Sequence, residues 1–135
     1  MLYNFSFTVP ADTPEDAPVI TELKLSAGII HRLEVEFRYG PSFMVFVKIL
    51  RGGFQLFPIN RASSLRGDGN IIGSDEYEEL TEDDNTLKII AYSPGTQYDH
   101  EIIVRVGILP PDVVGPLSGI GGALKKFLSL IGVGV

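Results

Sequence analysis

Apolar and polar residues alternate one by one along much of residues 1–110, and this alternation constrains the fold more than any other feature of the sequence. Successive side chains of a β-strand point to opposite faces, so a period of two is typical of a half-buried strand. The same pattern recurs in 3–9, 19–25 and 98–109. It is clearest in 28–37, where one face is predicted to carry Ile29, His31, Leu33, Val35 and Phe37.

Clusters of Pro, Gly, Asp and Ser separate these segments and are typical of turns. The segment 43–50 is apolar except for Lys48, which indicates a central strand covered on both faces or an interface. Residues 58–70 read as a long polar loop, and Gly73-Ser74-Asp75 as a break between two short strands. About eight or nine short strands predict an all-β fold, a single antiparallel β-sandwich. A jelly roll fits best, and an immunoglobulin-like sandwich stays open.

The character of the chain changes after Pro111, and we expect residues 1–111 to form the sandwich and 112–135 a Gly-rich apolar tail. Apolar residues step by three and four there, which predicts a short amphipathic helix. Its glycines weaken the helix, so the apolar stripe needs a packing surface. We expect docking or self-association, with packing on its own domain or on a membrane surface as alternatives. The stripe consists of Leu117, Ile120, Leu124, Phe127, Leu128 and Ile131.

Charge and composition exclude several classes of function. Eleven Lys and Arg against 17 Asp and Glu give a net charge of −6, which argues against binding to nucleic acid. No segment reaches the roughly 18 uninterrupted apolar residues of a transmembrane helix. There is no Cys, so disulfides and thiolate metal sites are excluded. With 44% apolar residues, part of the apolar surface is expected to face a partner.

No motif in the sequence carries chemistry. His31 and His100 lie on apolar faces without a third ligand at metal spacing, so we expect structural histidines and no metal. The acidic group between Asp75 and Asp84 matches no EF-hand spacing, and a solvated acidic rim is favoured over a weak cation site. No nucleophile stands beside an identifiable base. We therefore expect a non-enzymatic protein without a cofactor.

The strand rhythm of Gly28 to Phe37, Phe43 to Arg51 and Tyr98 to Leu109 resembles that of the small jelly-roll virion proteins of tailed bacteriophages, the head decoration or cement type. The acidic, Cys-free composition and the apolar tail agree with this resemblance. It implies a virion location and an assembly, often a trimer, that sits over capsid lattice points.

The leading hypothesis is a structural protein that forms homo-oligomers and binds a larger protein lattice such as a capsid. Its contact residues are predicted to be the stripe of the tail together with Phe43, Val45 and Phe46. A carbohydrate-binding β-sandwich module is an alternative, because exposed aromatic rings stack on sugar faces. The rings expected to do so are Tyr39, Tyr77, Tyr92 and Tyr98. A surface-layer or pilus-like assembly subunit is a further alternative.

Overall fold

The computed structural model describes residues 1–110, which form nine strands and no helix. The prediction of an all-β fold is confirmed for this part of the chain. The predicted boundary after residue 111 and the predicted helix of the tail lie outside the described residues. The strands are β1 (Leu2–Val9), β2 (Val19–Lys24), β3 (Gly28–Phe37), β4 (Phe46–Arg51), β5 (Phe54–Phe57), β6 (Leu65–Arg66), β7 (Asn70–Leu80), β8 (Thr86–Tyr92) and β9 (His100–Leu109).

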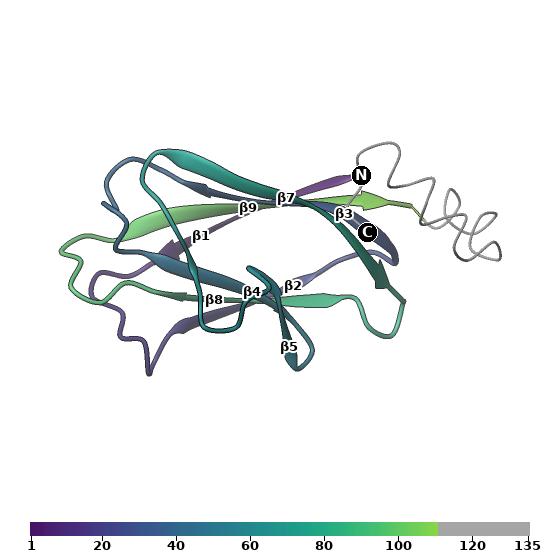
Figure 1. The fold of residues 1–135 in the computed structure, drawn as a ribbon, viewed down its shortest axis with the longest axis horizontal. Coiled ribbons are helices and arrows are strands. Elements are labelled where there is room, and N and C mark those ends of the chain that lie inside the picture. The colour runs from purple at the N-terminus through teal and green to yellow at the C-terminus, as the bar shows by residue number, and fades with distance from the viewer. Residues whose placement is uncertain (111–135) are drawn as a thin grey trace.

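The strands form two antiparallel sheets that lie one over the other (Figure 1). Sheet A has the order β1-β9-β3-β7, and sheet B has the order β2-β8-β4-β5, with β6 also beside β4. None of the described residues belongs to a helix long and apolar enough to cross a membrane.

The strand pairs are nested along the chain. The first strand pairs with the last, β2 with β8, β3 with β7, and β4 with β5 and β6. The contacts β3·β9 and β4·β8 then join these pairs into the two sheets. The strands β1, β2 and β3 thus pair with β9, β8 and β7 from the later part of the chain. The loops that follow β1, β2, β3, β6, β7 and β8 each run from one sheet to the other.

The hydrophobic core lies between the sheets and takes side chains from both. Sheet A contributes the inward faces of β3 and β9, and sheet B those of β4 and β8. Each large apolar side chain enclosed in this way stabilises the fold by roughly 1.5–3 kcal/mol. The fully enclosed side chains that these four strands contribute to this core are Ile30, Leu33, Val35, Phe37, Val47, Ile49, Leu87, Ile89, Ala91, Ile102, Val104, Val106 and Ile108.

A register shift at His31 corrects the predicted alternation of β3. The pairing with both neighbouring strands slips between Ile30 and Arg32, as it does at a β-bulge. Ile30 therefore joins Leu33 in the core cluster between the sheets. Ile29 is buried as the period of two predicted, whereas His31, predicted on the same face, is only half-buried. The His31 ring lies instead against Gly107, where an added Cβ would be 2.9 Å from Nε2.

Gly73 does not break the chain as its sequence context predicted. It lies inside one continuous strand, β7, whose register with β3 runs through Glu34 opposite Gly73. An added Cβ at this position would be 2.3 Å from Nη2 of Arg32. The glycine therefore provides room for an arginine of the neighbouring strand.

Two further segments differ from the prediction. The strand expected over 43–50 begins only at Phe46, because Ser42 and Phe43 have positive φ angles of 51° and 62°. The loop expected over 58–70 contains the two-residue strand β6, which pairs with the start of β4. A two-residue strand carries too little alternation to be read from sequence.

Gly28 provides a test of this packing. Its φ is +150°, and an added Cβ would lie 2.3 Å from the carbonyl oxygen of Leu109, a backbone atom of β9. We expect Gly28→Ala to lower the free energy of unfolding by about 2 kcal/mol or more, measured by urea denaturation. Gly53→Ala is the matched control, since nothing lies within 4 Å of its added Cβ. Equal stabilities of the two variants would contradict the close contact of β3 and β9.

Candidate functional site

Four loops meet at one end of the sandwich, called here the loop end. They connect β1 to β2, β3 to β4, β6 to β7, and β8 to β9, and they lie at the left of Figure 1. The chain start and the β7–β8 loop lie at the opposite end. Loops held by a rigid scaffold are a frequent location of binding residues.

A buried hydrogen-bond network joins the β1–β2 loop to the β8–β9 loop. Thr13, Ser93 and Thr96 are buried polar residues, with Ser93 fully enclosed. The Ser93 hydroxyl donates to the carbonyl oxygen of Pro10 at 2.8 Å and accepts from the Thr13 amide at 3.2 Å. Thr96 Oγ1 accepts from the Asp12 amide at 2.9 Å. A buried network whose members are satisfied in this way fixes the positions of both loops.

Two carboxylates extend the same network at the surface. Asp12 accepts from the amide of Gly95, and Asp99 accepts from the amide of Ala11, both at 2.8 Å. Each carboxylate belongs to one loop and binds the backbone of the other. The two loops therefore form a single rigid unit.

The β3–β4 loop is held by the β6–β7 loop. The Gly40 amide donates to Asp68 Oδ1 at 2.7 Å, and the Gly69 amide donates to the carbonyl oxygen of Arg38 at 3.1 Å. Positive φ angles at two successive non-glycine residues, Ser42 and Phe43, make this a strained segment. Strain of about 1–3 kcal/mol per residue persists where the surroundings impose it and is concentrated at functional sites.

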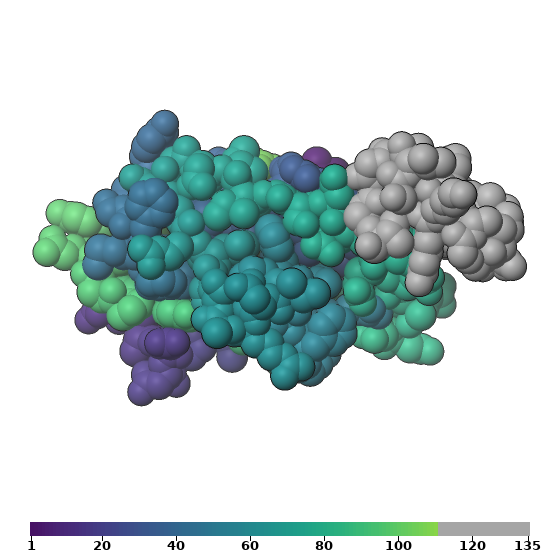
Figure 2. Space-filling model, in the orientation of Figure 1, coloured from purple at the N-terminus to yellow at the C-terminus, as the bar shows by residue number. Residues whose placement is uncertain are grey.

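These loops display large apolar side chains to solvent. Tyr39 is 88% exposed, Tyr98 73% and Phe43 50%, and Met44 is also exposed. In Figure 2 the β3–β4 loop and the β8–β9 loop stand out as a blue and a light green lobe at the same end of the molecule. Met44 and Tyr98 line one cleft of about 230 Å³, and Tyr39 lines another of about 300 Å³. We call the four side chains the loop-end patch.

The structure separates the contact residues predicted in the apolar segment. Phe43 belongs to the loop-end patch. Val45 is fully enclosed in the core of its own chain and so offers no surface to a partner. It lies on the same inward face as Val47 and Ile49 of β4. Phe46 is half-buried on sheet B, stacked on Tyr92 at 5.1 Å with the Arg66 guanidinium over its ring. The six predicted contact residues between 117 and 131 lie outside the described residues.

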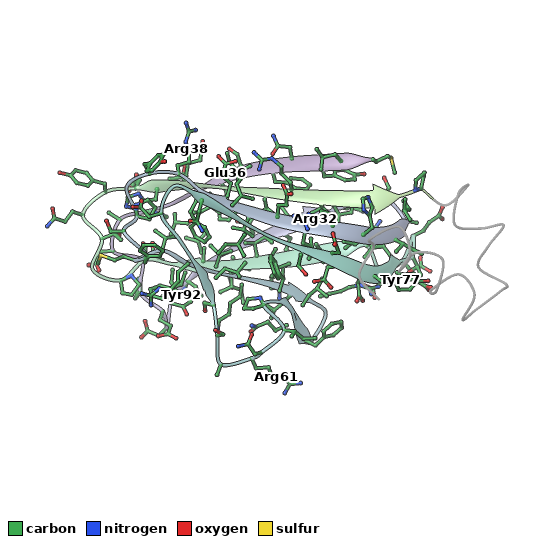
Figure 3. All side chains as sticks on the ribbon, turned by 45° about the horizontal axis from the view of Figure 1, so that its top comes forward. Arg32, Glu36, Arg38, Arg61, Tyr77 and Tyr92 are labelled. Atoms are coloured by element: carbon green, nitrogen blue, oxygen red, sulfur yellow. The ribbon has the colours of Figure 1, made fainter. Side chains whose placement is uncertain are left out.

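The predicted sugar-stacking tyrosines do not share a surface. Tyr92 is buried, with its hydroxyl 2.8 Å from the Ser64 hydroxyl, so its ring is closed to a ligand. Tyr77 is half-buried at the other end of the molecule, where its hydroxyl donates to Glu79 (Figure 3). Of the four, Tyr39 and Tyr98 are the two that are exposed at the loop end.

The two histidines lie at opposite ends of β9. His31 rests on Gly107, while His100 begins the strand beside Gly40. The seven residue steps from His100 to Gly107 span about 23 Å at the usual rise of a strand. Burial, followed by the charge of the Met1 amino group, lowers the pKa of His31, and Asp75 opposes this. The described residues contain no group of three or more metal-ligating side chains that could hold an ion.

Arginines neutralise part of the acidic group between Asp75 and Asp84. Arg51 of β4 pairs with Glu78 of β7 and, at 3.2 Å, with Asp84, and so connects sheet B to sheet A. Arg32 pairs with Asp75 at 3.1 Å. Burial raises the pKa of Glu76, against a hydrogen bond from Ser74. Glu76 and Glu78 are half-buried. The other carboxylates of the group are exposed, as predicted for a solvated acidic rim: Asp75, Glu79, Glu82, Asp83 and Asp84.

The outer face of sheet A carries a ladder of opposite charges. Arg38 pairs with Glu101 at 2.8 Å, and Arg105 with Glu36 at 2.7 Å. In Figure 3, Arg32 and Glu36 of β3 and Arg38, the residue after its end, lie in one row. Partly exposed pairs of this kind contribute little stability. They make this face hydrophilic, in contrast to the loop end.

Comparisons with known proteins give information on the fold. No family model and no curated protein matches the sequence. The structure is similar to a chain of the cyanophage Pam1 capsid asymmetric unit, with a TM-score of 0.53 and 15% identity over 82% of this chain and 84% of that chain. The Yersinia pseudotuberculosis-derived mitogen has a TM-score of 0.46 and 8% identity over 81% and 86%. The Tobacco streak virus coat protein has 0.40 and 11% over 82% and 90%. The first likeness concerns the fold alone, and the two lower scores carry no argument.

Phe43 tests whether the loop-end patch is displayed or serves packing. We expect Phe43→Asn to change the free energy of unfolding by less than about 0.5 kcal/mol, because asparagine tolerates a positive φ and the ring is half exposed. Phe37→Asn, at a side chain that is 1% exposed, is the control and should cost about 3 kcal/mol or more. Equal losses in thermal or urea unfolding would show that Phe43 is a core residue.

Proposed function

We propose that the two sheets form a jelly roll. The nested order of pairs supports this, since β1·β9, β2·β8, β3·β7 and β4·β5 are the pairs that arise when one long hairpin is rolled into two sheets. In an immunoglobulin-like sandwich several strands pair with the next strand of the chain. Within residues 1–110 this holds for one pair alone, β4 and β5. The similarity to the phage capsid chain, which concerns the fold, also supports this proposal.

On this fold we propose a non-enzymatic assembly protein that associates with itself and binds a larger protein lattice, as a virion component does. The observation that carries the proposal is the loop-end patch, four large apolar side chains presented by hydrogen-bonded loops. Rigid aromatic side chains give contact area at low cost in conformational entropy. Tyr and Phe are also enriched in the centres of protein interfaces.

The remaining surface fits an interaction role. Of the titratable groups between residues 1 and 110, those with perturbed pKa values, such as His31 and Glu76, lie away from the clefts of the loop end. Perturbed groups gathered in a cleft are the usual mark of catalysis. The apolar stripe of the tail is the second proposed contact, with Leu124 and Phe127 at its centre.

The test is the size of the full chain in solution. We expect light scattering to give a mass above 14.7 kDa that rises with concentration, and deletion of residues 115–135 to reduce it. The deletion variant should keep its β-sheet circular dichroism spectrum, since residues 1–110 contribute both sheets and the core described between them. A strict monomer at every concentration, unchanged by the deletion, would count against assembly.

A carbohydrate-binding module is a second candidate, because Tyr39 and Tyr98 are the most exposed aromatic rings of the described chain and each borders a cleft. If it holds, a glycan array gives saturable binding that Tyr39→Ala and Tyr98→Ala both abolish. Tyr92→Phe, a change at a buried ring, is the control and should leave binding intact. An array without specific binding removes this candidate and leaves the assembly protein.

A further inference from the structure

The two sheets have four edge strands, and three of them carry features that oppose pairing with another chain. β7 bears four carboxylates, at Asp75, Glu76, Glu78 and Glu79, and its register with β3 is interrupted. β2 carries Glu22 and Lys24, and on the far side of sheet B the edge is divided between β5, with four residues, and β6, with two. Charges, irregular register and short length are the usual protections of a sheet edge.

β1 has none of these protections. Its sequence, LYNFSFTV, contains no charged residue and no proline. It pairs with β9 through eight successive residues, from Leu2 opposite Gly107 to Val9 opposite His100, without a bulge. Within residues 1–110, no strand lies on its other side. A regular, uncharged edge of this length presents a row of free backbone donors and acceptors to another strand.

The side chains of β1 are also incompletely covered. Tyr3, Phe5 and Phe7 face inward, yet all three are only half-buried, and Tyr3 and Phe5 stack on each other with ring centroids 5.7 Å apart. Asn4 and Ser6 point outward and are exposed. The inward face of the edge is therefore aromatic and the outward face is polar.

We propose that β1 is the pairing edge for a second copy of this chain, antiparallel and centred on Phe5. The pattern of β1 is symmetric about this residue, which makes the strand complementary to itself. In this register Phe5 lies opposite the partner's Phe5, and Tyr3 opposite the partner's Phe7. Asn4 lies opposite the partner's Ser6. Aromatic and small polar pairs stabilise antiparallel strands, and no like charges meet.

The resulting dimer has a two-fold axis and joins both copies of sheet A into one continuous sheet. Such an interface is isologous, with the same residues contributed by each copy. It differs from the three-fold arrangement implied by the resemblance to decoration proteins. The inference rests on the proposed self-association and names one of its surfaces.

Sedimentation equilibrium of the full chain tests the proposal. In Asn4→Lys/Ser6→Lys the lysines of the two copies would face each other twice, so the dimer dissociation constant should rise about tenfold or more. Both positions are exposed in the single chain, but Asn4 lies opposite Arg105 of β9, so circular dichroism and thermal unfolding check that the double variant keeps its fold. The control Ile20→Lys/Asn60→Lys adds the same charge at exposed positions of sheet B and of the β5–β6 loop, and it should leave the constant unchanged.

Because the chain has no Cys, engineered cysteines report the register directly. An equimolar mixture of Asn4→Cys and Ser6→Cys should form mixed disulfide dimers under mild oxidation well beyond the roughly twofold excess over either self-paired product that random pairing gives, since opposite Cβ atoms lie about 4.5–5.5 Å apart. The ratio of about 1:2:1 that random pairing gives, or an excess of self-paired products, overturns the proposal. The proposal is also overturned if the two lysines leave association unchanged while removal of residues 115–135 abolishes it. In that case the proposed function, self-association, still stands. A chain that stays monomeric at all concentrations overturns both.

Discussion

The contact between the two sheets is the interaction on which the rest of the structure depends. The inward faces of β3 and β9 in sheet A cover those of β4 and β8 in sheet B, and neither sheet has another apolar layer within the described residues. Nested pairing brings these strands together, since β9 joins β1 on one side and β3 on the other. The core therefore forms only when the first and last described strands are both in place.

The same nested order determines where the surfaces of the molecule lie. It gathers four loops at one end, where Ser93 and Thr13 join segments 80 positions apart in sequence. It places the ion pairs of β3 and β9 in the middle of the outer face of sheet A, where charged pairs fit. It also leaves β1 at an edge, with its aromatic side half covered. The hydrophilic face, the loop end and the open edge all follow from one topology.

The sequence predicted the strands well where alternation extends over many residues. β3 and β9 were found almost to their ends, because each buries one complete face. The prediction failed where a neighbouring strand decides the local structure. The sequence around Gly73 predicts a break, but this glycine leaves room for the side chain of Arg32 on the neighbouring strand. The register shift at His31 depends on both flanking strands.

The candidate site was less accessible to sequence reasoning than the fold. Phe43 and the exposed tyrosines at 39 and 98 were identified from residue type, but Val45 and Tyr92 were assigned to surfaces although both are buried. The buried network of Ser93 was missed because its partners come from a loop far away in the chain. A serine in a Pro-Gly turn gives no sign of such partners.

Amide hydrogen exchange of the full chain, measured over a range of protein concentrations, tests most directly whether the molecule buries further surface against its own kind. We predict that exchange at the amides of Leu2–Val9 slows as concentration rises, while exchange at those of His100–Leu109, already paired on both sides, stays unchanged. Exchange rates independent of concentration along the whole chain would contradict it.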